Sequence, residues 1–481
     1  MSYSQSPTME QTRLLAIKGD VEAQFNLGQF YLTANQYADK LVDECADEFN
    51  RDSFEALHWF QKAADQGHAK ALYQLGEFYE NGIAISQDCD EALKWFQLAV
   101  EFGNVDAMLK LAKIYLSGIY SDYGIAQDFG LALSYFEQAA HQGHHDAIYQ
   151  LALIFENGVA VECSIPKHYS IKKNAKKAFH YWQILAKNGD LAAQFKLGLC
   201  YQNGDGVDLD LTKAIKLYKT LADNNYSKAI YQLGLIYESD IYGLKDLLTA
   251  FQYIKHAAEQ NYAQAQYHYG TFYRDGNVVA QDFSIAAKWF RLAAAQDHGD
   301  AWDNVGYLHI YGLGVKKSRT YGFKCFEKAA QLDSMMGCYH VGLSYINYWG
   351  ARHSRKMAAH WFKIAADKGL AEAQYQLARC YPYSQFTKDV FIKIFELDKA
   401  AAEQGYQPAF SYLAWAYKEG RGTKKDLETG YMWHCVDAVL SKRLFWYKED
   451  MEKIFTQEQI EKIKKAAQRC IDSGFKICSV Q

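Results

Sequence analysis

Apolar residues recur at helical spacing from one end of this chain to the other. In the segment 70–79, Ala71, Leu75 and Tyr79 are spaced i, i+4 and i+8, so they share one face of a helix. Gly82 follows within a turn, and glycine commonly ends a helix in the left-handed conformation. The segment therefore predicts an amphipathic helix, here called helix A, that ends at a glycine turn.

A second amphipathic segment follows at 90–99, where Ala92, Trp95 and Phe96 form a stripe of small and aromatic residues. We call it helix B. The same stripe recurs as Ala132/Tyr135/Phe136, Ala286/Trp289/Phe290 and Ala358/Trp361/Phe362. Short loops between A and B predict antiparallel helix pairs. One pair cannot bury both of its apolar faces, so neighbouring pairs must stack.

The first small residue of helix A recurs with a period. It falls 36 residues apart at Ala193, Ala229, Ala265, Ala301, Gly337, Ala373 and Ala409. Upstream it falls at less even steps, at Ala23, Ala71, Ala107 and Ala147. A repeat of this length is typical of one supersecondary unit stacked on itself. We call this residue the anchor of each unit.

The period divides the chain into eleven units between two caps. Residues 1–19 are predicted to form an N-terminal capping helix, from Thr8 to Lys18, and residues 441–481 to form C-terminal capping helices. The predicted units lie near 20–67, 68–103, 104–143, 144–189, 190–225, 226–261, 262–297, 298–333, 334–369, 370–405 and 406–440. One elongated array is expected instead of several globular domains.

Three insertions explain the uneven upstream steps, and each enters a loop between helices A and B. The first insertion, between Ala34 and Ala56, is acidic, with Asp39, Asp43, Glu44, Asp47, Glu48 and Asp52. The third, between Gly158 and Ala178, is basic, with Lys167, His168, Lys172, Lys173, Lys176 and Lys177. These loops are either contact surfaces or solvated insertions that the scaffold tolerates.

Composition narrows the class of protein. A hydrophobic content of 49% suffices for a continuous core, and a net charge of −4 gives no electrostatic case for nucleic acid. No apolar run approaches the length of a membrane helix, so no membrane insertion is expected. The ten cysteines show no CxxC spacing and are predicted to be buried thiols in a reducing, cytoplasmic compartment. The alternative is a Cys325–Cys338 bridge between facing helices.

Residues that resemble a catalytic or metal site are explained by the repeat. His144 occupies the position three before an anchor, which elsewhere holds His68, His298 or Asp190, and is predicted to cap helix A rather than bind a metal. Gly204-Asp-Gly206 lacks the lysine of a phosphate loop and is predicted to be a helix-closing turn. No nucleophile or carboxylate pair stands apart from the repeat, so neither an enzyme, a cofactor nor a metal is predicted.

These motifs resemble the Sel1-like repeat family, a relative of the tetratricopeptide repeat. The resemblance rests on the Ala-x-x-x-Leu-Gly-x-x-Tyr pattern, on Gly204-Asp205-Gly206-Val207 and Gly312-Leu313-Gly314-Val315, and on Trp-Phe-x-x-Ala-Ala, over residues 12 to 440. The segment 456–463 resembles the closing helix of such arrays. The resemblance implies an all-α, right-handed α/α superhelix (solenoid) that acts as a protein-interaction adaptor.

Positions that vary among the copies predict where a partner binds, because the anchors are committed to packing. By analogy with tetratricopeptide arrays, the A helices line a concave groove. Its C-terminal half offers Arg274, Tyr307, Tyr311, Trp349, Arg379, Trp415 and Lys418, and its middle offers an apolar patch of Leu153, Leu199 and Leu235. Exposed Trp, Tyr and Arg are common interface hot spots. Alternatively, the leucines pack between adjacent helices and Trp415 covers the C-terminal cap.

The predicted function is a non-enzymatic, cytoplasmic adaptor, of a bacterial regulatory or signalling kind, that binds a protein or peptide. The alternative is an immunity or inhibitor protein that neutralises a cognate toxin, since the family permits that use. An immunity protein predicts one very tight partner, whereas an adaptor predicts weaker and multiple partners. The sequence leaves the oligomeric state and the partner open.

Overall fold

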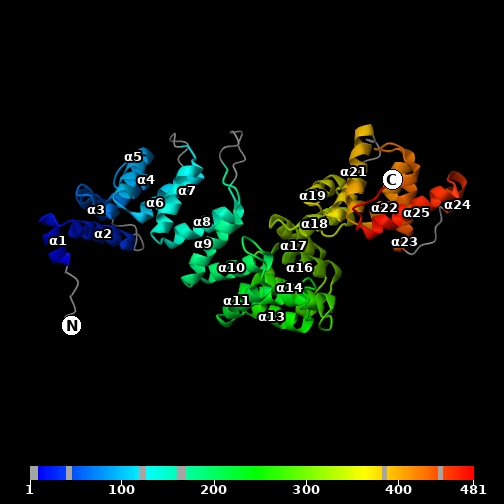
Figure 1. The fold of residues 1–481 in the computed structure, drawn as a ribbon, viewed down its shortest axis with the longest axis horizontal. Helices are drawn as coiled ribbons and strands as arrows, with labels where there is room; N and C mark the ends of the chain where they lie inside the picture. The colour runs from blue at the N-terminus through cyan, green and yellow to red at the C-terminus, as the bar shows by residue number, and fades with distance from the viewer. Residues whose placement is uncertain are drawn as a thin grey trace. The chain divides into compact units, whose positions relative to one another are not determined.

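The computed structural model describes residues 9–38, 46–118, 126–159, 170–381, 387–441 and 448–480. Every named element in these ranges is an α-helix, and the one strand-like contact is an isolated antiparallel bridge between Val159 and Ile171 (Figure 1). The predicted all-α fold is confirmed. Within the described ranges, no helix is long and apolar enough to cross a bilayer.

The helices form two compact units, Met1–Tyr226 and Ser227–Gln481. The first contains α1 Met9–Ile17, α2 Val21–Ala38, α3 Ala46–Ala64, α4 Ala69–Asn81, α5 Cys89–Glu101, α6 Val105–Ser117, α7 Phe129–His141, α8 His145–Asn157, α9 Ala175–Lys187, α10 Leu191–Asn203 and α11 Leu211–Asp223. Helix α1 lies within residues 1–19, the segment for which a capping helix was predicted.

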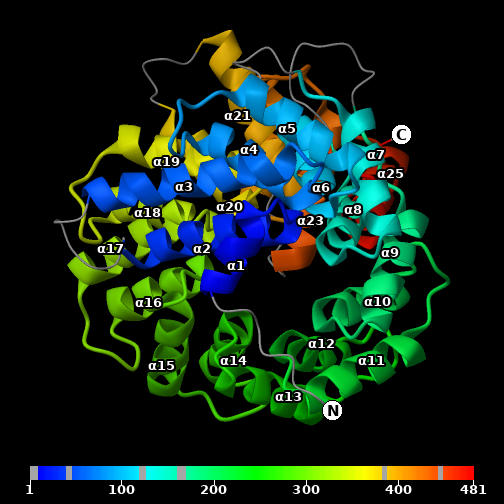
Figure 2. The ribbon, with the colours of Figure 1, turned by 90° about the vertical axis from the view of Figure 1, so that its left-hand side faces the viewer.

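The second unit continues the same alternation of A and B helices. It contains α12 Ser227–Glu238, α13 Leu247–Glu259, α14 Ala263–Asp275, α15 Phe283–Ala294, α16 Gly299–Tyr311, α17 Arg319–Gln331, α18 Met335–Asn347, α19 Arg355–Asp367, α20 Ala371–Cys380, α21 Lys388–Glu403, α22 Gln407–Glu419, α23 Leu427–Ser441, α24 Lys448–Ile454 and α25 Gln457–Asp472. Within each unit, consecutive helices such as α4 and α5 pack side by side, as Figure 2 shows. Both units are therefore segments of an α-solenoid.

A recurring side-chain cap starts the A helices. The residue three before the anchor accepts a hydrogen bond from the anchor N–H: His144 Nδ1 from Ala147 at 3.4 Å, and Asp190 Oδ1 from Ala193 at 2.7 Å. The same bond forms in other units, at His68, Asn104, His298 and Ser334. This satisfies a backbone donor that the helix leaves free. The interpretation of His144 as a capping residue is confirmed.

A second recurring contact joins helix A to helix B. A Cβ added to Gly76 would lie 2.5 Å from Phe96 Cε1, so only glycine allows this close approach. The helix B residue at the position of Phe96 is large, apolar and wholly buried in nine successive units: Phe60, Phe96, Phe136, Trp182, Tyr218, Ile254, Phe290, Phe326 and Phe362. We call this series the inner ladder. From Trp182 onward its members lie 36 residues apart.

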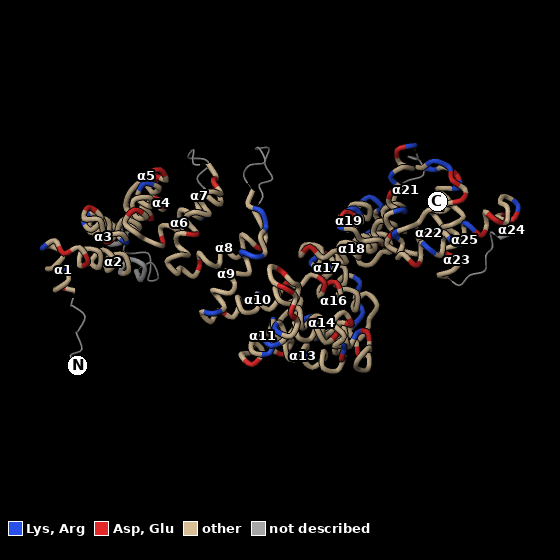
Figure 3. The backbone as a smooth tube through the Cα atoms, viewed as in Figure 1, with Lys and Arg blue, Asp and Glu red and all other residues tan. Residues whose placement is uncertain are grey.

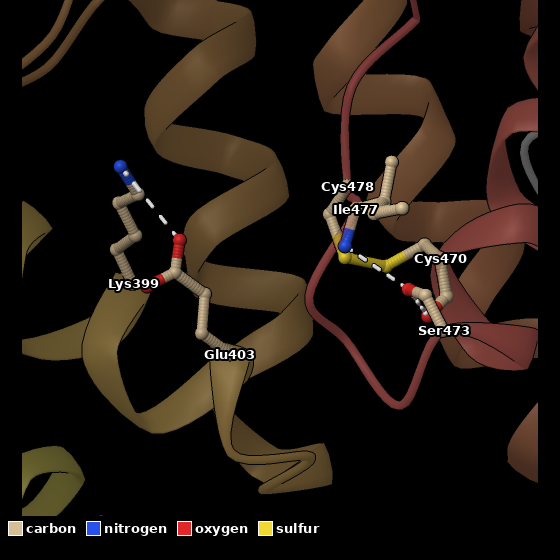
Figure 4. Close-up of a disulfide and its surroundings, with 6 residues drawn as sticks. All are labelled: Lys399, Glu403, Cys470, Ser473, Ile477 and Cys478. Carbon is tan, nitrogen blue, oxygen red and sulfur yellow. Dashed lines mark hydrogen bonds and ion pairs between the residues drawn. A yellow bond between two sulfur atoms is a disulfide. The ribbon is translucent and has the colours of Figure 1, made fainter.

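The prediction that all cysteines are unpaired was wrong for Cys470 and Cys478, which form a disulfide in the C-terminal cap (Figure 4). After α25, Gly474 and Phe475 adopt positive φ values of 59° and 66° and turn the chain back, which places the two Cα atoms 4.5 Å apart. Ser473 Oγ accepts a hydrogen bond from the Ile477 N–H at 3.0 Å and holds this turn. The bridge considered from the sequence is absent, because Cys325 and Cys338 are both free and buried.

Peptide mapping without reduction is expected to recover Cys470 and Cys478 as one cross-linked fragment. The Cα separation suits a disulfide, and the turn after α25 brings the two residues together. Blocking free thiols under denaturing conditions before digestion prevents exchange, and a reduced sample is the control. Recovery of both cysteines in the alkylated form from unreduced protein would contradict the pairing.

The irregular units differ from the pattern in specific ways. Helix α2 runs to Ala38, beyond the loop start expected at Ala34, because the insertion extends the helix. The base of the third insertion is fixed by the Val159–Ile171 bridge, with N···O distances of 2.8 and 2.9 Å. Asp39, Asp43, Glu44, Lys167 and His168 lie outside the described residues.

Candidate functional site

A pocket of about 570 Å³ opens in the second unit between helices α20, α21 and α22. Its apolar wall comes from Phe391, Ile394 and Phe395 on α21 and from Trp415 and Ala416 on α22. Its charged residues are Arg379, Asp398 and Arg421. The pocket thus combines a mostly apolar lining with three charged side chains, between the tenth and eleventh predicted units.

The pocket lies where the inner ladder, in the tenth predicted unit, no longer has a large apolar residue. The next position after Phe362 in the 36-residue series is Asp398, a much smaller and ionisable side chain. Ala378 stands at the helix A position that is glycine in the preceding unit, where Gly342 faces Phe362, and that is alanine at Ala112, Ala152 and Ala414. An aspartate in a slot shaped for phenylalanine leaves space unfilled, and both Ala378 and Asp398 line the pocket.

Asp398 is only 2% exposed and is paired with Arg379 across the two helices. Arg379 Nη2 donates to Asp398 Oδ2 at 2.5 Å. Burial raises the pKa of Asp398 to about 6, although the Arg379 charge acts in the opposite direction. Arg379 Nη1 and Asp398 Oδ1 are buried and have no hydrogen-bond partner. The pair is therefore incompletely satisfied.

The guanidinium groups of both pocket arginines lie over the faces of aromatic rings. The Arg379 guanidinium carbon lies 3.7 Å from the centroid of the Tyr412 ring and 4.9 Å from that of Tyr375. That of Arg421 lies 4.3 Å from the Trp415 centroid. Stacking of this kind fixes the plane of a guanidinium and leaves its edge, which carries the N–H donors, pointing away from the ring. The site is therefore preorganised before any ligand binds.

The structure brings together some of the predicted interface residues. Arg379 and Trp415 line the same pocket. Tyr307, Tyr311 and Trp349 form a separate aromatic cluster, with ring centroids 4.7 Å apart for the tyrosines and 5.7 Å apart for Tyr311 and Trp349. Both tyrosines are exposed, whereas Trp349 packs partly against the core. The residues predicted for the C-terminal half of the groove therefore form two separate sets, one in the pocket and one in the aromatic cluster.

Arg274 and Lys418 belong to neither group. Arg274 is occupied by hydrogen bonds to Asp275 and to Asn304. The Lys418 ammonium lies 4.6 Å from the Tyr431 ring centroid.

The predicted apolar patch is divided between the units. Leu153 packs against the core of the first unit, as the alternative interpretation of the leucines expected. Leu199 is half-buried in the first unit and Leu235 is half-buried in the second.

Sequence reasoning missed Asp398, Tyr412, Arg421 and Phe391. It followed the variable positions of the A helices, and these residues lie on a B helix, on another face of α22 and in the turn after it. The sequence did contain evidence for Asp398. Continuing the inner ladder by 36 residues from Phe362 reaches an aspartate, and a charged residue in a buried apolar series is a recognisable departure.

Two solved structures with TM-scores above 0.5 share this fold over most of their length. A Sel1 repeat protein from Oxalobacter formigenes is 28% identical, with a TM-score of 0.55 over 71% of this chain and 91% of its own. A protective antigen of uropathogenic Escherichia coli, c5321, has a TM-score of 0.54 and 24% identity over 98% of this chain and 96% of its own. The immunity protein Pa5087 of Pseudomonas aeruginosa reaches a TM-score of 0.33, with 18% identity over 49% of this chain and 84% of its own. No curated protein matches the sequence.

The family profile described as the Sel1 repeat matches most of the chain. The matched residues are 21–36, 50–68, 69–104, 105–144, 145–190, 191–226, 227–262, 263–298, 303–334, 336–370, 371–389 and 411–435. The gap between 389 and 411 contains Asp398 and most of α21, where the inner ladder departs from its pattern. The chain belongs to the Sel1 repeat family.

Proposed function

We propose that this protein is a non-enzymatic interaction scaffold that binds a segment of another protein in the pocket between α20, α21 and α22. The observation that carries the proposal is the pocket itself, which a departure from the inner ladder creates and which two stacked arginines and an exposed tryptophan line. Sel1 repeat proteins generally serve as interaction scaffolds, which supports the same class of function.

Stability alone does not account for the residues of the pocket. A buried ion pair loses the hydration of both charges and is often no more stable than apolar residues of similar volume. The nine preceding ladder positions use such apolar residues. Departures from the local rules of a fold concentrate at functional sites. The replacement of a ladder residue by Asp398, with Arg379 opposite, therefore favours a binding role.

Affinity purification followed by mass spectrometry tests this function. Tagged wild-type protein is compared with Trp415→Ala, which removes a 43% exposed ring from the pocket rim, and with Phe54→Ala, which removes a 55% exposed ring from α3 in the other unit. We expect Trp415→Ala to lose partners that wild type and Phe54→Ala retain, because exposed tryptophans are frequent hot spots. Equal recovery by all three proteins, with unchanged melting curves, would reject the pocket as the binding site.

The compartment belongs to the same proposal. The predicted cytoplasmic location depended on reduced cysteines, and the Cys470–Cys478 disulfide removes that argument. Disulfides persist mainly in oxidising compartments, so we propose a location outside the reducing cytoplasm.

The alternative of an immunity or inhibitor protein stays a prediction, since no feature of the pocket favours it.

A further inference from the structure

The charges around the pocket do not balance. Its charged residues are the two arginines and Asp398, so the pocket is positive even when Asp398 is ionised. Charged residues of both signs are interspersed along the chain as a whole, and the protein carries a net charge of −4 (Figure 3). A locally positive pocket therefore contrasts with the rest of the molecule.

The two arginines also retain unused hydrogen-bond donors. Arg379 spends Nη2 on Asp398 and leaves Nη1 without a partner. Arg421 is exposed and contacts the rings of Trp415 and Phe391, with no carboxylate of the described residues within ion-pair distance. A guanidinium has no acceptor atom, so both arginines can be satisfied only by a group that accepts hydrogen bonds.

Four apolar residues of the lining favour an apolar group beside that acceptor. Phe391, Ile394 and Phe395 on one side and Ala416 on the other offer no hydrogen bond from their side chains. Binding of an apolar side chain in such a pocket is favourable because it removes apolar surface from water. The same occupant must therefore carry an acceptor, preferably anionic, next to a large apolar side chain.

On the basis of the proposed function, we infer that the pocket binds an acidic peptide segment of the partner. A carboxylate of the segment lies between Arg379 and Arg421, and an adjacent apolar side chain enters the cavity. Planar, stacked guanidiniums suit a carboxylate, which they can bind in a fork-to-fork geometry. A cationic segment is disfavoured, because Arg379 and Arg421 already occupy the Tyr412 and Trp415 rings that would otherwise bind it.

Two sources can supply the carboxylate, a side chain of Asp or Glu and the C-terminus of the partner. The experiment therefore uses two libraries of short random peptides, one displayed with a free C-terminus and one with the C-terminus blocked. Each is selected in parallel on full-length wild type and on Trp415→Ala. Peptides enriched only on wild type are synthesised, and their Kd values are measured by fluorescence anisotropy.

The expected peptides depend on Trp415 and place a carboxylate next to a large apolar residue. Arg421→Gln is expected to weaken their binding at least about tenfold, because it removes a charge-assisted hydrogen bond. The control Arg352→Gln, at an exposed arginine outside the pocket, should leave the Kd unchanged. Replacing the peptide carboxylate by an amide should weaken binding to wild type by a similar factor. The same replacement should weaken binding to Arg421→Gln little further, because both changes remove the same interaction.

Enrichment in both libraries would assign the carboxylate to a side chain, and enrichment only with a free C-terminus would assign it to the chain end; both support the inference. Trp415-dependent peptides that lack a carboxylate, or that carry Lys or Arg instead, would overturn it while leaving the pocket as a binding site. The inference would also be overturned if the losses of binding free energy from the amide substitution and from Arg421→Gln were additive, because the peptide carboxylate and Arg421 would then not interact. Absence of any Trp415-dependent peptide from both libraries would overturn this inference, and unchanged partner capture by Trp415→Ala would overturn the proposed function.

Discussion

The double substitution Asp398→Phe with Arg379→Leu is expected to stabilise the protein by about 1–4 kcal/mol, because it replaces a buried ion pair by apolar packing. Phe restores the residue type of six of the nine preceding ladder positions, and Leu occupies the position corresponding to Arg379 in the preceding unit, at Leu343. The added ring fills part of the 570 Å³ pocket. The measurement is the thermal melting curve of the full chain, in which the variant should melt at a higher temperature than wild type.

A reciprocal variant provides the matched control. Phe362→Asp with Leu343→Arg places the same ion pair one unit earlier, 36 residues upstream. Phe362 is wholly buried against Gly342, so this variant should melt well below wild type. If Asp398→Phe with Arg379→Leu instead lowered the melting temperature by several degrees, the ion pair would be the better packing solution at this unit, and the functional argument built on it would lose its basis.

The single substitution Asp398→Ala is expected to destabilise the protein by about 3 kcal/mol, the lower end for removing one partner of a buried pair. It leaves the Arg379 charge among aromatic rings without its carboxylate. The lower end applies because the Arg379 side chain is 23% exposed and retains some hydration. Denaturant unfolding of the full chain, followed by circular dichroism, measures the loss.

Adding Arg379→Leu to Asp398→Ala separates the two contributions to this loss. Removing the unpaired charge should recover a large part of the stability, and what remains is the cost of the larger cavity. No recovery in the Asp398→Ala, Arg379→Leu variant would show that cavity volume, and not an uncompensated charge, dominates at this position.

The fold was predictable from the sequence because its determinants are local and repeated. Many units carry their own side-chain cap, such as His144, and their own close contact, such as Gly76 against Phe96, so the period follows from the packing. The disulfide was not predictable in this way. It depends on a reverse turn that requires positive φ at Phe475, and aromatic residues seldom signal that conformation.

The site was predictable only in part. Arg379 and Trp415 lie at variable positions of A helices, where comparison among the repeats detects them. Asp398 lies on a B helix and Tyr412 on another part of α22, and their significance depends on which helices pack around the pocket. Tyr307 satisfies the same sequence criterion as Trp415 but lies in a different cluster, with Tyr311, since the criterion identifies positions and not pockets.

The most direct test of the pocket between α20, α21 and α22 is partner capture by the variant that restores the inner ladder. Full-length wild type and Asp398→Phe with Arg379→Leu are used as baits under identical conditions, and the recovered proteins are quantified by mass spectrometry. We predict that the variant loses the partners of wild type while melting at an equal or higher temperature, so that unfolding cannot explain the loss. Recovery of the same partners in the same amounts would contradict the conclusion that this pocket is the binding site.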